Sequence, residues 1–362
     1  MPGWLEHDNR EAPHSALDMQ SPAECYAAWF VTNKQQPLQN YVGQYKQMNE
    51  VSWIKQIPRA RLYSSLVERR LKSLARIQSL PSVFNDSVME LLCSGGKLIR
   101  PVLTLCASEV TGKRHNVCAL DAAVALEMIH VSSLILDDII DESPKRRGIG
   151  SLHKKYGYDV AIVSAGMLLL RAYRSTGEAQ KMRNILYDTT FKLLLGQAVE
   201  TRGDVCTEKQ YIRMIQFKTA SLFEASMKLG AVANKLPNSV TLKLVEYGRN
   251  LGMAFQIRDD ILDMIVSPRR LQKPVRMDLR KGKPTILGAK AYDSLKTTPN
   301  GLAKISNQSL VQLTMSRNIL DAANQLANEY AHRAIAAVID LRSTPGKRCL
   351  VELAEKATRR DS

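Results

Sequence analysis

The sequence of 362 residues predicts an all-α protein, a bundle of helices around a deep central cavity. Long apolar stretches without the alternation of a β-strand follow one another along most of the chain, and Gly and Pro fall between them. A chain of this length can bury a large core, and no low-complexity linker divides it. We therefore expect an N-terminal extension over residues 1–55 and one all-α domain over residues 56–362.

The extension comes first, and the helices follow in order. Residues 1–50 are polar, rich in Gln and Asn and weakly periodic, which is typical of a partly disordered segment. Apolar residues at helical spacing predict three short helices, at Leu62–Leu74, Val88–Leu92 and Leu103–Val110. Longer helices are expected at 119–140, 158–174, 183–201, 208–233, 239–265 and 309–341, and a last one at Leu350–Ala357 closes the core.

Two copies of one acidic pentapeptide lie more than a hundred residues apart, Asp137–Asp141 (the first acidic motif) and Asp259–Asp263 (the second acidic motif). Positions i and i+4 of a helix share a face, so the outer aspartates of each motif project together, with the middle one a step round the helix. The six carboxylates belong to Asp137, Asp138, Asp141, Asp259, Asp260 and Asp263. Mg²⁺ is commonly held by one or two carboxylates and by phosphate oxygens, so two facing motifs predict metal-borne diphosphate chemistry.

A single acidic motif of this kind is usually a solvated helix face or a helix cap. Both copies here, however, end an apolar stretch, Leu134–Leu136 in the first case and Met253–Phe255 in the second. Anions clustered at the end of a buried helix are costly without a counter-ion. The duplication and its apolar surroundings therefore favour a functional site.

Several cationic residues lie close to these motifs in the sequence. Lys97 and Arg100 are three positions apart after a flexible Gly pair, and His130 lies two helical turns before Asp137. Arg146 and Arg147 follow the first motif and supply rigid, multi-donor groups that suit diphosphate oxygens. Each has an ordinary alternative: a basic helix start, a core histidine, or a surface arginine pair.

Together these segments resemble the trans-type isoprenyl diphosphate synthases, especially the polyprenyl and geranylgeranyl branches. The similar segments, in the family's order from about residue 60, are GGKLIRP, EMIHVSSLILDDIID with SPKRRG, GQAVE, FKTASLF, GMAFQIRDDILD and DLRKGKPT. The resemblance implies the isoprenoid-synthase type of all-α bundle, usually dimeric, with three Mg²⁺ ions between the two acidic motifs. It also implies that an allylic diphosphate condenses with isopentenyl diphosphate to give a linear trans-prenyl diphosphate.

The resemblance also implies roles for individual residues. The six aspartates would hold the metal ions on the allylic diphosphate. The cations on that diphosphate would be Arg146, Lys218 and Lys273, whereas Lys97, Arg100, His130 and Arg147 would bind the diphosphate of isopentenyl diphosphate. Thr219, where the family's helix is distorted, and Gln256 would turn oxygens toward the allylic cation, and Gln197 would orient groups near the first acidic motif.

Product length is expected to depend on the residues below the first acidic motif. Ser132 and Ser133 stand five and four positions before Asp137, where short-chain members of the family carry bulky aromatics. Without that aromatic floor, we expect products of twenty carbons or more. Tyr173, on the facing apolar helix, is either a deeper floor or an ordinary core residue.

The chain departs from the family pattern at two places. Met167 stands where the family usually has Asp, and Leu271–Lys273 reads Leu-Gln-Lys rather than Leu-Gly-Lys.

Two other functions are alternatives to a prenyl synthase. A class I terpene cyclase would use the same metal-triggered ionisation but needs no second diphosphate site. A non-catalytic partner subunit of a heteromeric synthase commonly lacks one or both acidic motifs.

The charge, the cysteine spacing and the apolar runs indicate which kinds of partner and which cellular location to expect. The net charge of +16 favours anionic partners, but no basic stripe interleaved with aromatics appears, so we expect no nucleic-acid partner. The six cysteines have no zinc-like spacing, and charged residues interrupt the most apolar run, Ala122–Ile140, so no transmembrane segment is expected. Residues 1–24 are acidic, unlike a presequence. We expect a cytoplasmic protein, with an organellar location left open, that is a homodimer or part of a heteromer and makes peripheral membrane contact.

Overall fold

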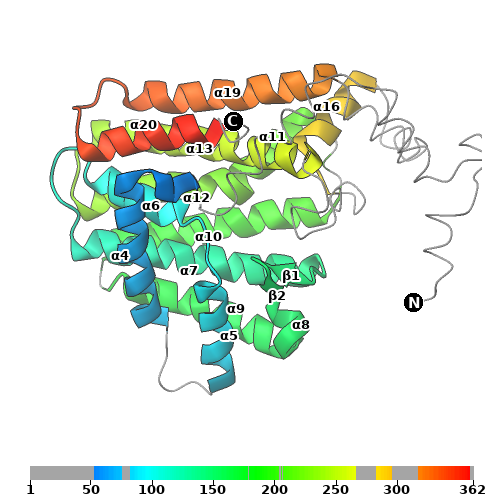
Figure 1. The fold of residues 1–362 in the computed structure, drawn as a ribbon, viewed down its shortest axis with the longest axis horizontal. Coiled ribbons are helices and arrows are strands. Elements are labelled where there is room, and N and C mark those ends of the chain that lie inside the picture. Colours follow the sequence, from blue (N-terminus) through cyan, green and yellow to red (C-terminus); the bar gives the residue numbers. More distant parts are fainter. Residues whose placement is uncertain are drawn as a thin grey trace, which may run out of the picture. The chain divides into compact units, whose positions relative to one another are not determined.

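The computed structural model describes residues 53–75, 82–177, 179–203, 205, 207–265, 283–295 and 317–358. This part of the chain is almost entirely helical (Figure 1), as the sequence predicts. The predicted extension lies outside the described residues except for its last three positions, and so does the beginning of the helix expected at 309–341.

The first half of the bundle contains η2 (Trp53–Gln56), α4 (Pro58–Ala75), α5 (Ser82–Cys93), α6 (Ile99–Ser108), α7 (Val117–Ile140), β1 (Lys145–Arg146), β2 (Ile149–Gly150), α8 (Leu152–Tyr156) and α9 (Tyr158–Ser175). The second half contains α10 (Gln180–Thr201), α11 (Glu208–Ile215), the π-helical turn η3 (Gln216–Ala220), α12 (Ser221–Ala233), α13 (Asn238–Ile265), α16 (Ile286–Leu295), α19 (Arg317–Val338) and α20 (Pro345–Thr358). The expected run 208–233 is therefore one helical path with a π-turn inside it. The hairpin β1–β2 and the helices α8 and α16 were not predicted.

Helix α7 lies at the centre of the bundle and contacts α6, α9 and α12. Its alanines, which include Ala119, Ala122, Ala123 and Ala125, are fully buried and let the neighbouring helices approach closely. The helix is long and apolar enough to cross a membrane, but 67% of its most apolar window is buried inside the protein. It is the only such helix among the described residues, and it is built as the core helix of a globular bundle.

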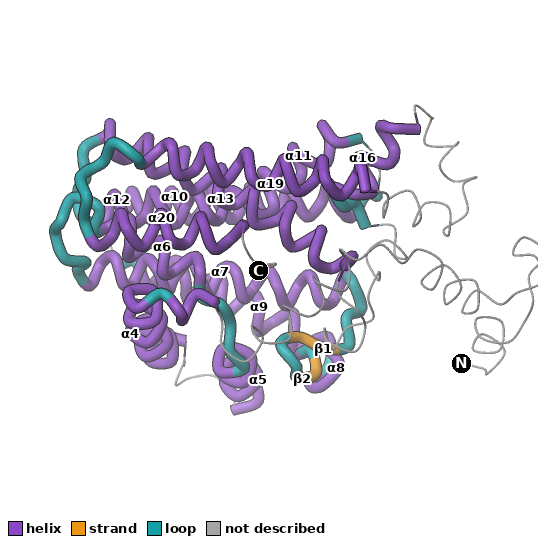
Figure 2. Tube along the Cα trace, turned by 45° about the horizontal axis from the view of Figure 1, so that its top comes forward, coloured by secondary structure: helices purple, strands orange, loops and turns teal. Residues whose placement is uncertain are grey.

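The loops that precede α7, α13 and α20 gather at one end of the bundle, away from the hairpin β1–β2 (Figure 2). Side chains tie them together: the Asn116 amide donates to Ala233 O at 2.9 Å, and Thr344 Oγ1 donates to Val110 O at 3.1 Å. Asn116 also caps α7 by accepting from Ala119 N at 2.8 Å. Because α7 and α13 start at the same end, the acidic motifs at their other ends lie on the same side of the bundle.

Two glycines bring neighbouring helices against η3. A Cβ on Gly196 of α10 would lie 2.5 Å from Lys218 N, and a Cβ on Gly252 of α13 would lie 2.7 Å from Ala220 Cα. Only glycine permits such backbone approach. One helical turn beyond these glycines stand Glu200 and Gln256, which are thereby brought beside the π-turn.

Candidate active site

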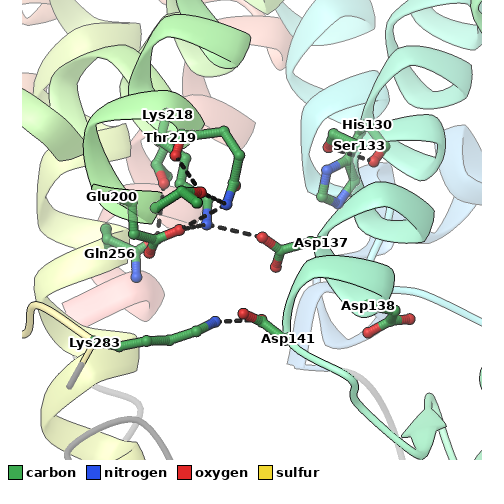
Figure 3. A network of polar contacts seen from close by, with 12 residues as sticks. His130, Ser133, Asp137, Asp138, Asp141, Glu200, Lys218, Thr219, Gln256 and Lys283 are labelled. Carbon is green, nitrogen blue, oxygen red and sulfur yellow. Dashed lines mark hydrogen bonds and ion pairs between the residues drawn. The ribbon is translucent and has the colours of Figure 1, made fainter. Parts of the chain in front are cut away.

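The outer aspartates of the first acidic motif face cations that come from other parts of the chain (Figure 3). Asp137 Oδ1 accepts a hydrogen bond from Lys218 Nζ of η3 at 3.0 Å. Asp141, the C-cap of α7, pairs with Lys283 Nζ, which stands just before α16. The predicted common face of Asp137 and Asp141 is therefore present, and it is directed at two lysines.

The middle aspartate, Asp138, points away from these lysines (Figure 3). It is buried, and Arg146 holds it through Nε, at 3.0 Å from both carboxylate oxygens, and through Nη2. Although burial lowers the pKa of Arg146, the bond to Asp138 raises that pKa overall. Asp138 thus anchors the hairpin that follows the motif rather than facing the gap with its neighbours.

The anchored hairpin turns tightly through Arg147 and Gly148. Both residues have left-handed backbone angles, with φ of 51° and 82°, as a two-residue hairpin turn requires. Glycine adopts this conformation freely, whereas an arginine there is strained and marks a position where its side chain has a use. The turn aims Arg147 back toward α7, where its Nη2 lies 3.8 Å from Glu127 Oε1.

Lys218 lies between two carboxylates, Asp137 of α7 and Glu200 of α10 (Figure 3). Burial lowers the pKa of Lys218, but the two carboxylates raise it overall, so the ammonium stays charged. Burial likewise raises the pKa of Asp137, but Lys218 and Lys283 lower it overall. Lys218 and Asp137 therefore both carry their charges at neutral pH.

Glu200 and Lys283 were not predicted as site residues, although both lie in segments that carry the family resemblance. Gln197, which was assigned, donates its amide to Glu200 Oε2 at 3.1 Å and so supports the lysine's second partner. Lys273 lies outside the described residues.

The second acidic motif is split in the same manner as the first. Asp259 is partly buried and Asp263 is exposed, whereas Asp260 is buried. Asp260 Oδ2 accepts from Tyr211 OH at 2.6 Å and from Ile286 N at 3.1 Å, and Oδ1 accepts from the Gln256 amide at 2.8 Å. Burial outweighs these donors and raises the pKa of Asp260 to about 7.

Thr219 and Gln256 meet beside the second motif. Thr219 Oγ1 donates to Gln256 Oε1 at 2.8 Å. The expected distortion of the helix at Thr219 is confirmed, because this residue lies in the π-turn η3. Such turns are frequent at functional sites since they disturb the regular backbone hydrogen bonding.

The four residues expected at a second diphosphate come together in the structure. Arg100 of α6 and His130 of α7 are joined by a 3.0 Å hydrogen bond between Nη1 and Nε2. The Arg100 guanidinium also lies 5.0 Å from the ring centre of Phe223, and Lys97 Nζ lies 5.9 Å from that of Phe255. The two rings contact each other at a tilt of 46°, with their centres 5.3 Å apart. Arg147 joins them at Gly96, where an added Cβ would stand 3.0 Å from its guanidinium.

Glu127 is a buried counter-ion of this cation group; it is only 2% exposed and was not identified from the sequence. Burial lowers the pKa of Arg100 to about 10, and burial followed by the charge of Arg100 lowers the pKa of His130 well below its usual value. Within the described part of the chain, Arg100 Nε is buried and makes no hydrogen bond. Such a site has cationic donors left over for an anion.

The expected chain-length residues lie on the two facing helices. Ser132 of α7 is buried and donates to Ala165 O of α9 at 2.8 Å, whereas Ser133 is partly exposed and donates to its own helix at His130 O. Tyr173 lies two turns beyond Ala165 on α9 and is partly buried, as is Met167 on the same helix.

Comparison with known proteins agrees with this arrangement. Residues 81–321 match the family model described as polyprenyl synthetase. The chain is 34% identical to the geranylgeranyl diphosphate synthase of Saccharolobus solfataricus over 74% of this chain and 86% of that one. It is 30% identical to the octaprenyl diphosphate synthase of Escherichia coli over 80% and 93% of the two chains. The fold is similar to the crystal structure of geranylgeranyl pyrophosphate synthetase from Pyrococcus horikoshii, with a TM-score of 0.74 and 28% identity over 83% of this chain and 97% of the other.

Proposed function

The chain belongs to the polyprenyl synthetase family and is a prenyltransferase that makes trans-prenyl diphosphates, and on this premise we propose its substrates, ions and residue roles. The substrates are an allylic diphosphate and isopentenyl diphosphate, and the product is linear and has twenty carbons or more. The geranylgeranyl synthases among the relatives support a product of that size.

One observation favours a condensation of two diphosphates over the cyclase reaction. The cation group around Arg100 and His130 consists of residues outside the two acidic motifs, and it retains the buried donor Arg100 Nε, which makes no hydrogen bond within the described residues. We assign it to the diphosphate of isopentenyl diphosphate, bound by Lys97, Arg100, His130 and Arg147. A terpene cyclase needs no such second anion site. A non-catalytic subunit is disfavoured because both acidic motifs are complete.

The residues present fit Mg²⁺ that is bound together with a diphosphate. No group of three or more potential ligands gathers in the described residues, so phosphate oxygens would complete the coordination. We propose three ions, held by Asp137 and Asp141 on one side and by Asp259 and Asp263 on the other. When bound, Mg²⁺ would neutralise charge that develops on the departing diphosphate.

The protein's own residues then act on the two substrates. Lys218 and Lys283 exchange a carboxylate partner for oxygens of the allylic diphosphate, with Arg146 and Lys273 as further cations near it. As the allylic C–O bond breaks, the oxygens of Thr219 and Gln256 face the carbocation. The isopentenyl double bond attacks the cation, and the proton that is then lost passes to the released diphosphate.

Incubation of the protein with Mg²⁺, labelled isopentenyl diphosphate and allylic primers of five to twenty carbons tests this proposal. Linear prenyl alcohols after phosphatase treatment are expected, and their size gives the product length. Hydrocarbon formed from an allylic diphosphate alone would favour a cyclase. An absence of turnover with every primer would favour the partner-subunit function.

Ser132→Phe is expected to shorten the product. The substitution adds a ring between α7 and α9 below the first acidic motif, since Ser132 touches Ala165 of α9. Product length is measured by chromatography after phosphatase treatment, with Ser133→Phe as the comparison because Ser133 bonds only to its own helix. If both variants turn over and neither changes the product, these serines do not limit chain length.

A homodimer is proposed from an apolar surface on α9 and α10. Eight large apolar side chains, four on each helix, are 39% to 65% exposed: Tyr158, Ile162, Val163, Leu170, Tyr187, Phe191, Leu194 and Leu195. Exposed apolar side chains that gather on a helix face favour a protein interface there. Light scattering is expected to give twice the chain mass of 40.5 kDa. The mass of a single chain would rule out the homodimer, and activity only with another subunit would favour a heteromer.

Location and domain division also stay proposals. We propose a cytoplasmic enzyme whose contact with membranes is peripheral, since α7 is used as a core helix. Cell fractionation tests the location. Limited proteolysis tests the boundary between the extension, residues 1–55, and the domain, residues 56–362.

A further inference from the structure

Four side chains from three elements form one unbroken chain of hydrogen bonds beside the second acidic motif. Thr219 of η3 donates to Gln256 Oε1 at 2.8 Å, and Gln256 Nε2 donates to Asp260 Oδ1 at 2.8 Å. At the far end, Tyr211 of α11 donates to Asp260 Oδ2 at 2.6 Å. Tyr211 is fully buried and has no role in the condensation described above.

This series of hydrogen bonds fixes the orientation of the Gln256 amide. A glutamine amide can turn over and exchange its oxygen and nitrogen, and the Thr219 hydroxyl can pair with either end. The ionised Asp260 carboxylate accepts only from the nitrogen, which leaves the Gln256 oxygen to accept from Thr219. The direction of the Gln256 amide dipole is therefore set by Asp260.

Asp260 is in turn held by donors behind it. Tyr211 OH and Ile286 N both bond to Oδ2, so Oδ1 is the oxygen turned toward Gln256. The Tyr211 ring is immobilised in an apolar cluster with Met214, Ile257, Ile261 and Ile286. Burial, followed by the charge of Asp260, raises the pKa of Tyr211 well above its usual value, so the hydroxyl keeps its proton at neutral pH and donates it to Asp260.

We propose that Tyr211 and Asp260 are positioning residues that orient Gln256 and Thr219 for the prenyl transfer, and that Asp260 is not a metal ligand. This inference rests on the proposed function, because it concerns the group that faces the allylic cation. The proposal gives Asp260 a different role from Asp259 and Asp263, which remain the proposed metal ligands of the second acidic motif.

Tyr211→Phe tests the proposal, because it removes the hydroxyl and keeps the ring. Tyr247→Phe is the matched control: Tyr247 is also fully buried and donates one hydrogen bond, to Leu350 O at 2.7 Å, away from the acidic motifs. With kcat divided by the folded fraction, we expect a loss of roughly 10- to 100-fold for Tyr211→Phe and less than about twofold for Tyr247→Phe. The half-saturating Mg²⁺ concentration is expected to stay unchanged in both variants.

A double substitution distinguishes positioning from a merely structural role. If Tyr211 acts through Gln256, then Tyr211→Phe should change kcat by less than about twofold in a Gln256→Leu background. A readout that needs no turnover accompanies it: the two substitutions should also be non-additive in the urea midpoint of unfolding, because one hydrogen-bonded chain links them.

Three results would overturn the inference while the proposed function stands. They are an unchanged kcat in Tyr211→Phe, kcat losses that multiply in the double variant, or a half-saturating Mg²⁺ concentration that rises severalfold in Tyr211→Phe. If the unsubstituted protein makes no prenyl diphosphate from any primer, the proposed function fails, and the positioning role falls with it.

Discussion

Asp137→Asn is expected to lower kcat about a thousandfold, which corresponds to the loss of about 4 kcal/mol of transition-state stabilisation. Asparagine keeps the size of the side chain but is a poorer ligand for Mg²⁺ than a carboxylate. The fold should survive, because Lys218 keeps its second partner, Glu200. The rate is measured as incorporation of labelled isopentenyl diphosphate at saturating substrates over a range of Mg²⁺ concentrations.

Asp121→Asn is the matched control, since Asp121 lies on the same helix and also pairs with a cation, Arg70, at 2.6 Å. That pair lies far from the first acidic motif and is partly exposed, so its loss should cost about 1 kcal/mol of stability or less. Its kcat should remain within about twofold of the unsubstituted value. Retention of more than a tenth of the activity by Asp137→Asn would contradict its assignment as a metal ligand.

Arg100→Met is expected to raise the KM for isopentenyl diphosphate about a hundredfold and to leave the KM for the allylic substrate unchanged. Methionine replaces the aliphatic stem of the arginine but removes the buried donors, including the unpaired Nε. The effect should be selective because the allylic diphosphate is assigned to different cations, Lys218 and Lys283. The two KM values are measured separately, each with the other substrate saturating.

Arg249→Met controls for the loss of an arginine as such. Its side chain is 48% exposed and pairs with Glu224 on the surface, so both KM values should stay within about twofold. Equal increases of both KM values in Arg100→Met would mean that the two substrates share one anion site. That outcome would revive the cyclase interpretation.

The sequence predicted most helices and the face shared by Asp137 and Asp141, because period and spacing alone determine these features. It could not predict which way Asp138 is held. Its partner Arg146 lies on a two-strand hairpin, and that hairpin is too short to leave a periodic signal. The helix α8, with five residues, was missed for the same reason.

The supporting residues of the site were harder to find than the residues they support. Glu127, Glu200 and Tyr211 are single polar residues inside apolar or mixed helices, where one sequence gives no spacing rule. Their function depends on contacts with distant residues: Tyr211 meets Asp260 across 49 positions, and Lys218 meets Asp137 across 81. Such pairings follow from how the helices pack, which the local pattern does not encode.

The close approach of α10 and α13 to the π-turn limits how this protein can be redesigned for heat resistance. Exchanging a helical glycine for alanine is among the standard stabilising substitutions, since alanine is the better helix former. At Gly196 and Gly252 the added methyl would instead push the backbone that carries Lys218 and Thr219. A thermostable variant should therefore keep these two glycines and gain its stability at exposed helix positions.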